Sequence, residues 1–331
     1  MSAVLDVRDL HVRYPRALSL AARLGGERHP WVDVVRGVSL QIAPGQTLAV
    51  VGESGSGKTT LARALMGLVP SCGGEAHIEG ARLARSAHGL LQPDRRRVAM
   101  MFQDPVGSLS PRMTVRSALA EPFRIHRTGE TDADREALRL LAMVGLGPEF
   151  GERYPHQLSG GQARRIGVAR ALALKPSLLI ADEPTAGLDV SIQGDVLNLL
   201  SGLQQELGLS ILIITHNLNI VRHVADHMAI MYLGRFVEQG PSAEIFRHPR
   251  HPYTRALLSA NPSHDPGVVA ERLQLQGEIP SPSHRPPGCE FHTRCPWVAQ
   301  DCRSIPPNER EAAPGHRFSC WHPPTAAPQI P

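Results

Sequence analysis

Long apolar runs are missing from this chain of 331 residues. No segment approaches the about 18 consecutive apolar residues that a membrane-spanning helix needs. The first thirty residues carry charged side chains from Asp6 to Arg16 and lack an apolar stretch long enough for a signal peptide. We therefore expect a cytosolic protein, which could reach a membrane only through a partner.

A strong net charge and internal repeats are also missing. The formal charge of +4 is small for this length and does not by itself indicate nucleic-acid binding. We interpret the basic run 95–97 as a solvated face. Apolar residues make up 42% of the chain, which is enough for a substantial core.

A glycine-rich stretch after the apolar segment 47–51 is the most informative part of the chain. It matches the pattern GxxxxGK followed by Ser or Thr. In this pattern backbone N–H groups surround phosphate oxygens, the lysine (Lys58) reaches the β- and γ-phosphates, and the Thr59 hydroxyl can ligate Mg²⁺. A simple glycine-rich turn would not explain why all the fixed positions occur together. The sequence predicts a nucleoside triphosphate site built from Gly52, Glu53, Ser54, Gly55, Ser56, Gly57, Lys58, Thr59 and Thr60.

Two further apolar strands end in side chains that suit phosphate chemistry. The strand 177–183 ends in Asp182 and Glu183. Asp182 would hold Mg²⁺. Glu183 would orient and deprotonate the attacking water, a role worth roughly 10²–10⁴ in rate. The strand 210–215 is followed by His216, which could sense the γ-phosphate, although a lone histidine at a strand end is usually structural.

The segment 158–162, LSGGQ, matches the signature of ATP-binding cassette (ABC) ATPases. A serine and two glycines at a helix start offer N–H groups to phosphate, although Ser159 could also be an ordinary helix N-cap. The chain resembles this family, which implies an α/β P-loop fold with a RecA-like core, an antiparallel β subdomain and an inserted helical subdomain at about 105–174. It also implies ATP and Mg²⁺ as ligands. In the family the signature of one cassette completes the nucleotide site of a second cassette, here through Ser159, Gly160, Gly161 and Gln162.

The resemblance assigns three more positions. Tyr14 is similar to the aromatic residue that stacks on adenine, although it could equally be a core residue at a strand edge. Gln103, in the segment 102–105, matches the Q-loop residue that contacts Mg²⁺ and the attacking water. Asp189 matches the D-loop aspartate, although Ala186 and Gly187 depart from the usual Ser-Ala before it.

Changes in the residue pattern along the chain predict its organisation. Residues 4–50 alternate like strands around a polar insert near 24–29, which favours an antiparallel sheet. Helical spacing takes over from about 105 to 174, and a hairpin follows around 233–235. We expect a nucleotide-binding domain at 1–245 and an extension at 246–331.

The extension resembles that of one particular group within the ABC family. Residues 251–258 are similar to the segment that follows the cassette in ATPases of oligopeptide and dipeptide importers, which include nickel systems. This implies a peripheral subunit on the cytoplasmic face of the membrane that powers import of peptides or a related solute. Its implied partners are a second, paralogous ATPase, two transmembrane permease subunits and, indirectly, an extracytoplasmic solute-binding protein, with no nucleic acid.

Two alternatives come from soluble ABC proteins. A component of a carbon–phosphorus lyase assembly shares much of the family's sequence, but the cysteine-bearing tail argues against it. Proteins of translation or DNA repair normally carry two cassettes or a long coiled-coil insertion. This chain has one phosphate loop and one signature.

Four of the five cysteines lie in the extension, in a proline-rich segment with few large apolar residues. Disulfides are unfavourable in a reducing cytosol, so the clustered thiols indicate a shared metal. The lack of a CxxC pair disfavours a zinc ribbon, and the Cys295-Pro296 step recurs in iron–sulfur ligation, so the residues alone leave zinc and iron–sulfur equally open. The resemblance to peptide-importer ATPases favours a 4Fe-4S cluster, with zinc as runner-up and with His292 or His316 able to replace one thiol. The ligands would be Cys289, Cys295, Cys302 and Cys320.

Overall fold

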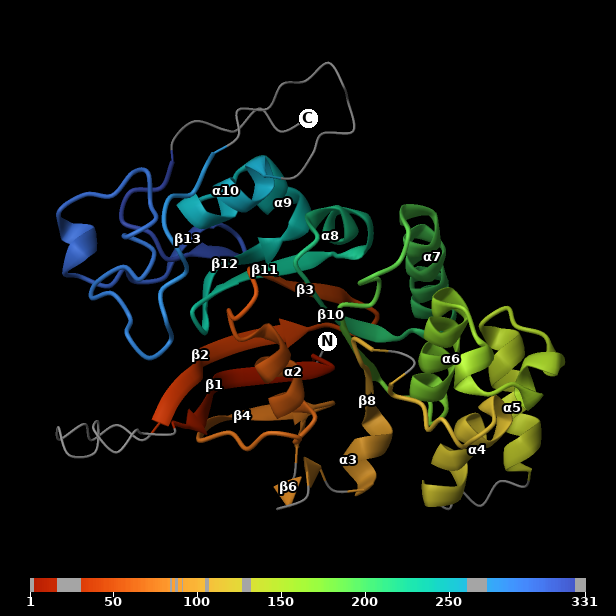
Figure 1. Ribbon diagram of the computed structural model, residues 1–331. Helices are drawn as coiled ribbons and strands as arrows, with labels where there is room; N and C mark the ends of the chain where they lie inside the picture. The colour runs from red at the N-terminus through yellow and green to blue at the C-terminus, as the bar shows by residue number, and fades with distance from the viewer. Residues whose placement is uncertain are drawn as a thin grey trace.

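Two large β-sheets, a two-stranded one and the helices around them make up the part of the chain that the structure describes (Figure 1). The smaller sheet has the strand order β2-β1-β4-β5, and the larger has β13-β14-β12-β11-β3-β10-β9-β8. The computed structural model describes residues 3–16, 31–83, 85–86, 89–90, 92–104, 107–126, 132–260 and 273–324. This α/β arrangement confirms the expected fold class.

The centre of the larger sheet follows from three runs of buried apolar residues: β3 (Thr47–Val51), β10 (Ser210–Thr215) and β9 (Leu178–Asp182). They pair in parallel, as do β8 (Val98–Met101) with β9 and β11 (His227–Tyr232) with β3. Parallel strands are covered on both faces, so continuous apolar runs are what this position requires. All three central strands lie where the sequence predicted them.

The smaller sheet is antiparallel and holds β1 (Leu5–Pro15), β2 (Trp31–Ile42), β4 (Gly73–Ile78) and β5 (Ala81–Arg82). The strand-like alternation over residues 4–50 therefore predicted its first two strands correctly. The polar insert near 24–29 lies outside the described residues. Two short strands, β6 (Arg85–Ser86) and β7 (Gly89–Leu90), pair with each other beside α3 (Gln92–Arg97).

Helices follow β8 in the chain and gather on one side of the molecule (Figure 1). They are α4 (Val115–His126), α5 (Ala133–Met143) and α6 (Gly160–Leu172), with α7 (Val190–Leu207) beside them. Their apolar faces share one core cluster, which includes Leu119, Leu140 and Ile166. No helix among the described residues is both long and apolar enough to cross a membrane.

The strands β11 and β12 (Arg235–Pro241) form the predicted hairpin in the larger sheet. The helices α8 (Leu218–Val224), α9 (Ser242–Arg247) and α10 (Pro252–Ser259) pack near this edge of the sheet (Figure 1). Two strands of the extension, β14 (His316–Phe318) and β13 (Arg310–Ala313), then add to β12. The sequence did not predict them, because they are short and β13 has no apolar face.

A fully buried contact joins the extension to the sheet. The His316 Nε2 atom lies 2.7 Å from the Glu238 Oε1 atom, and both side chains are 0% exposed. The Glu238 carboxylate also accepts backbone hydrogen bonds from Arg250 and His251. These bonds satisfy a buried carboxylate, which would otherwise carry a large desolvation cost. The extension therefore packs directly against the larger sheet of the cassette.

Candidate active site

A pocket of about 840 Å³ opens where β3, β9 and β10 end. The carboxyl ends of parallel strands are the usual place for ligands in such sheets. The structure brings eleven of the predicted site residues to this pocket: Gly52, Glu53, Ser54, Gly55, Gly57, Lys58, Thr59, Thr60, Gln103, Glu183 and His216.

The phosphate loop leads from β3 into α2 (Lys58–Leu65). Gly57 has a φ of 108°, and a Cβ atom there would lie 2.7 Å from the carbonyl oxygen of Val34. Only glycine fits both the conformation and the space. The Lys58 ammonium donates to the carbonyl oxygens of Gly52 and Glu53 at 2.8 and 2.9 Å. Burial lowers the pKa of Lys58. Ser56, within the loop, is buried.

Oxygen ligands suited to a divalent cation meet beside the loop. The Thr59 hydroxyl donates to the Asp182 Oδ1 atom at 3.3 Å. Asp182 is 3% exposed, and burial raises the pKa of its carboxyl group. A hard cation such as Mg²⁺ prefers such oxygens and would offset the burial of the charge. The donor set therefore fits Mg²⁺, with Thr59 and Asp182 as the residues that would hold it.

Glu183 and His216 meet although they are 33 positions apart in the chain. The His216 Nδ1 atom lies 2.7 Å from the Glu183 Oε1 atom. The pairing of β9 with β10 creates this contact, because each residue directly follows one of the two strands. Glu183 has a φ of +49°, a conformation that costs a non-glycine residue energy and that clusters at functional sites. A carboxylate and an imidazole at the pocket can accept a proton from a bound water.

Among the described residues that line this pocket, none belongs to the signature segment 158–162. Ser159 is the exposed N-cap of α6, and its hydroxyl accepts a hydrogen bond from the Gln162 N–H while the Gln162 side chain accepts one from the Ser159 N–H. The N-cap alternative for Ser159 is thus also realised. Asp189 is exposed at the start of α7. Tyr14, on β1, is half-buried and likewise is not among the described lining residues.

Arg164 is a buried cation that the sequence reasoning missed. It lies on α6, is 3% exposed, and donates to the carbonyl oxygens of Pro184 at 2.8 Å, Glu183 at 3.3 Å and Ala186. It therefore ties the signature helix to the loop that carries Glu183 and leads to Asp189. Its position two residues after the signature was the available signal.

The extension also reaches the phosphate loop. The Tyr253 hydroxyl on α10 accepts a hydrogen bond from the Glu53 N–H at 2.8 Å, and Arg294 binds the Glu53 carboxylate through two nitrogens at 2.7 and 3.0 Å. Leu257 and Ile279 line the pocket itself. Tyr253 and Leu257 belong to the importer-like segment 251–258, but no sequence motif indicated that any of these four residues would reach the phosphate loop or its pocket.

The four cysteines of the extension line one small cavity, together with Phe291, Trp297 and His322. Burial raises the pKa of Cys289, that of Cys295 to about 11 and that of Cys320 to about 12. Four thiols that line one cavity are a donor set that fits a thiolate-binding metal group. A second group, Asp301, Cys302 and His322, has ligand atoms within 4.8 Å of one another.

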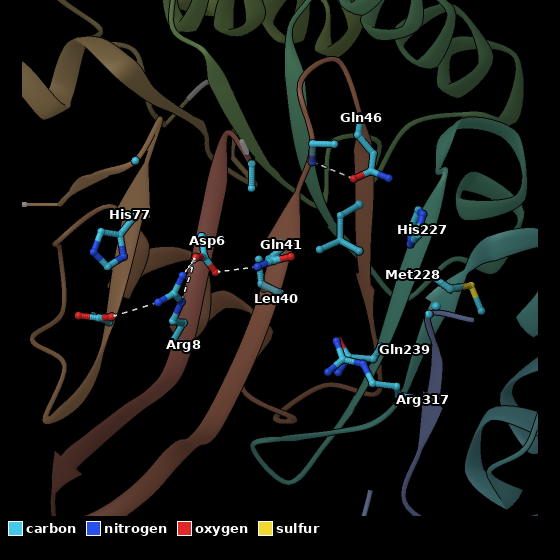
Figure 2. Close-up of a pocket in the computed structure, with 17 residues that line it drawn as sticks. Asp6, Arg8, Leu40, Gln41, Gln46, His77, His227, Met228, Gln239 and Arg317 are labelled. Atoms are coloured by element: carbon cyan, nitrogen blue, oxygen red, sulfur yellow. Dashed lines mark hydrogen bonds and ion pairs between the residues drawn. The ribbon is translucent and has the colours of Figure 1, made fainter. Parts of the chain in front are cut away.

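A separate open pocket of about 740 Å³ lies between the two sheets (Figure 2). Asp6, Arg8 and His77 line it from the smaller sheet, and His227 and Arg317 from the larger. Arg8 bonds Asp6 and also lies near Glu75. The pocket is lined by side chains of both charges, and none of its described lining residues is a predicted site residue.

Comparison with known families gives two matches. Residues 35–186 match the ABC transporter family, and residues 237–302 match the C-terminal region of oligopeptide/dipeptide transporters.

Curated relatives cover nearly the whole chain. A di/tripeptide transport ATP-binding protein, DppF of Pseudomonas aeruginosa, is 45% identical over 97% of this chain and 98% of its own length. An oligopeptide transport ATP-binding protein, AppF of Bacillus subtilis, is 44% identical over 96% of each chain.

Solved structures share the cassette. The dimeric ATP-binding cassette MJ0796, bound to ADP and phosphate, has a TM-score of 0.62 at 25% identity and covers 72% of this chain and 98% of its own. CbiO1 from Clostridium perfringens has the same TM-score at 26% identity and covers 74% of this chain and 91% of its own. The chain therefore belongs to the ABC family of transporter ATPase subunits, in the group that carries the oligopeptide/dipeptide transporter C-terminal region.

Proposed function

We propose that this protein is the ATP-hydrolysing subunit of an ABC importer for di- or oligopeptides. One observation carries the proposal: the phosphate loop, Gln103, Glu183 and His216 form one pocket, while the signature lies outside it. The full-length similarity to transport ATP-binding proteins named for di/tripeptides and oligopeptides supports the substrate class. The match over residues 237–302 supports it independently of the cassette.

Different residues at the pocket bind the phosphates, bind the metal and accept the proton during ATP hydrolysis. The loop N–H groups and Lys58 hold the phosphates of ATP. Thr59, Asp182 and Gln103 would hold Mg²⁺, which would supply positive charge beside the phosphate oxygens. Glu183 takes a proton from the attacking water. His216, held by Glu183, stays within reach of the γ-phosphate.

The exposed signature acts on a partner. Ser159, Gly160, Gly161 and Gln162 present the N-terminus of α6, and a helix N-terminus binds anions. We assign them, with Asp189, to the nucleotide held by a second, similar cassette, so that two ATP molecules lie between two chains. Tyr14 stacks on the adenine. The pair docks beneath two permease subunits on the cytoplasmic face of the membrane, and an external binding protein delivers the solute.

For the four cysteines we propose a 4Fe-4S cluster. The four cysteines line one cavity, and four thiolates are the ligand set of such a cluster. Zinc at Asp301, Cys302 and His322 is the alternative, because thiolate, imidazole and carboxylate are all zinc ligands.

The test is reconstitution of the ATPase pair, permeases and binding protein in liposomes. We expect ATP-dependent uptake of a labelled dipeptide or oligopeptide. Uptake of Ni²⁺ without peptide would favour the nickel-importer alternative. If no membrane subunit is recovered with this chain from detergent extracts, a soluble assembly such as a carbon–phosphorus lyase would be favoured instead.

A further inference from the structure

Glu53, the second residue of the phosphate loop, is held on two sides by the C-terminal extension. Its N–H donates to the Tyr253 hydroxyl, and its carboxylate accepts two parallel hydrogen bonds from Arg294. The Arg294 side chain is 6% exposed and that of Glu53 is 29% exposed. A bidentate pair of this kind fixes orientation as well as distance. The two residues are 241 positions apart in the chain.

The backbone that carries Arg294 is itself held in place. The Arg294 backbone N–H donates to the carbonyl oxygen of Phe291 at 3.0 Å. The Phe291 ring packs against Tyr232 and Tyr253, with ring centroids 5.3 and 5.4 Å apart. Cys295, which follows Arg294 in the chain, lines the cavity shared by the four cysteines. Arg294 therefore lies between the cysteine cavity and the phosphate loop, next in the chain to Cys295 and bonded directly to Glu53.

The charge of Glu53 explains why such a clamp is needed. A carboxylate in a loop that binds phosphates repels the ligand, and the repulsion is strong where solvent is partly excluded. Arg294 neutralises this carboxylate. The Lys58 ammonium meanwhile donates to the Glu53 carbonyl oxygen, so the backbone of the same residue is also held.

We propose that Arg294 is a positioning residue of the phosphate loop, which makes the C-terminal extension a working part of the nucleotide site. This inference rests on the proposed binding of ATP by the loop. Leu257 and Ile279, which also come from the extension, line the same pocket. The competing explanation is that the ion pair only fastens the extension to the cassette.

A charge-deletion cycle separates the two explanations. The probe is a fluorescent N-methylanthraniloyl derivative of ATP with Mg²⁺, titrated into the full-length chain. The variants are Arg294→Met, Glu53→Gln and their double mutant, with Arg294→Lys as the conservative change. Arg36→Met is the matched control, because Arg36 pairs with Glu290 and so joins the extension to the cassette without an ion pair to Glu53. Thermal melts check that each variant is folded.

We expect Arg294→Met to weaken binding about tenfold, because it leaves a carboxylate unpaired beside the phosphates. Glu53→Gln removes that carboxylate, so the double mutant should return to within about threefold of wild type. Arg294→Lys should show a smaller loss than Arg294→Met, and the loss should shrink as KCl is raised. Arg36→Met should bind like wild type.

Wild-type affinity in folded Arg294→Met would overturn the inference. A loss that Glu53→Gln does not relieve, or one that Arg36→Met reproduces, would also overturn it, because a fastening role predicts both. Failure of the wild-type chain to bind the probe would instead contradict the proposed function. Lys58→Ala serves as the reference for lost binding.

Discussion

The imidazole of His216 contacts the carboxylate of Glu183, with 2.7 Å between Nδ1 and Oε1. Glu183 is mostly buried, with 14% of its side chain exposed, whereas His216 is 68% exposed toward the pocket. The mostly buried carboxylate thus orients the exposed imidazole. This arrangement supports the proposed roles of Glu183 as the proton acceptor and of His216 as its neighbour on the pocket side.

Glu183→Gln should keep ATP binding and slow hydrolysis by roughly 10²–10⁴, about 3–5 kcal/mol of barrier, because the amide cannot take the proton. The cassette pair should then stay closed on ATP. The measurement is steady-state hydrolysis in the reconstituted transporter, beside nucleotide binding to the same preparation. Turnover like that of wild type would remove Glu183 from the role of base.

Ser159→Arg should lower hydrolysis by the assembled pair while the isolated chain still binds nucleotide. The reason is that α6 presents Ser159 outside the chain's own pocket, where bulk and charge would meet the partner's γ-phosphate. Ser159→Thr, which keeps a capping hydroxyl, is the control. Loss of binding in the isolated variant would show that the signature belongs to its own pocket.

The extension should carry iron when the protein is purified without oxygen. We expect about four irons per chain and a brown colour from a 4Fe-4S cluster, whereas zinc would leave the protein colourless. Elemental analysis and visible absorption decide between them. Cys302→Ser should lose the metal, while Cys72→Ser, a change of the exposed cysteine outside the extension, should retain it. An ordered extension with neither metal would contradict both assignments.

The stability of the fold should fall in mild acid partly because of His227. Burial lowers the pKa of this histidine in the folded chain. As the pH drops below the unfolded pKa of about 6.5, the unfolded chain therefore binds the proton first, and the free energy of unfolding falls by at most about 1.4 kcal/mol per pH unit. Above that pH the contribution is complete.

Urea unfolding at several pH values measures this effect, with His227→Gln as the comparison. The glutamine variant should lose less stability on acidification than the wild type. Parallel pH dependence in the two chains would show that His227 does not titrate on unfolding. His227 lines the open pocket of Figure 2, so the substitution leaves the candidate active site untouched.

Local patterns in the sequence were enough for much of the fold. The strands β3, β9 and β10 are visible because a fully buried parallel strand requires a continuous apolar run. The phosphate loop is visible because Gly57 and Lys58 must stand at fixed spacing between a strand and a helix. The division into domains at residue 245 stays a prediction.

Contacts between distant residues could not be predicted in the same way. Arg164 looks like any helical arginine until α6 packs on the loop after β9. The strands β13 and β14 carry too little apolar pattern to be recognised, and they form because β12 offers a free edge.

The sequence by itself thus determined the phosphate loop and the two carboxylates at the end of β9, because glycine conformation, a lysine at fixed spacing and acidic residues at a strand end are local patterns. Only the tertiary structure decided how the extension joins that site. The pairing of Arg294 with Glu53 spans 241 positions and depends on the aromatic cluster that packs the extension against the hairpin. Such a contact leaves no local trace, because either residue alone is an ordinary charged side chain.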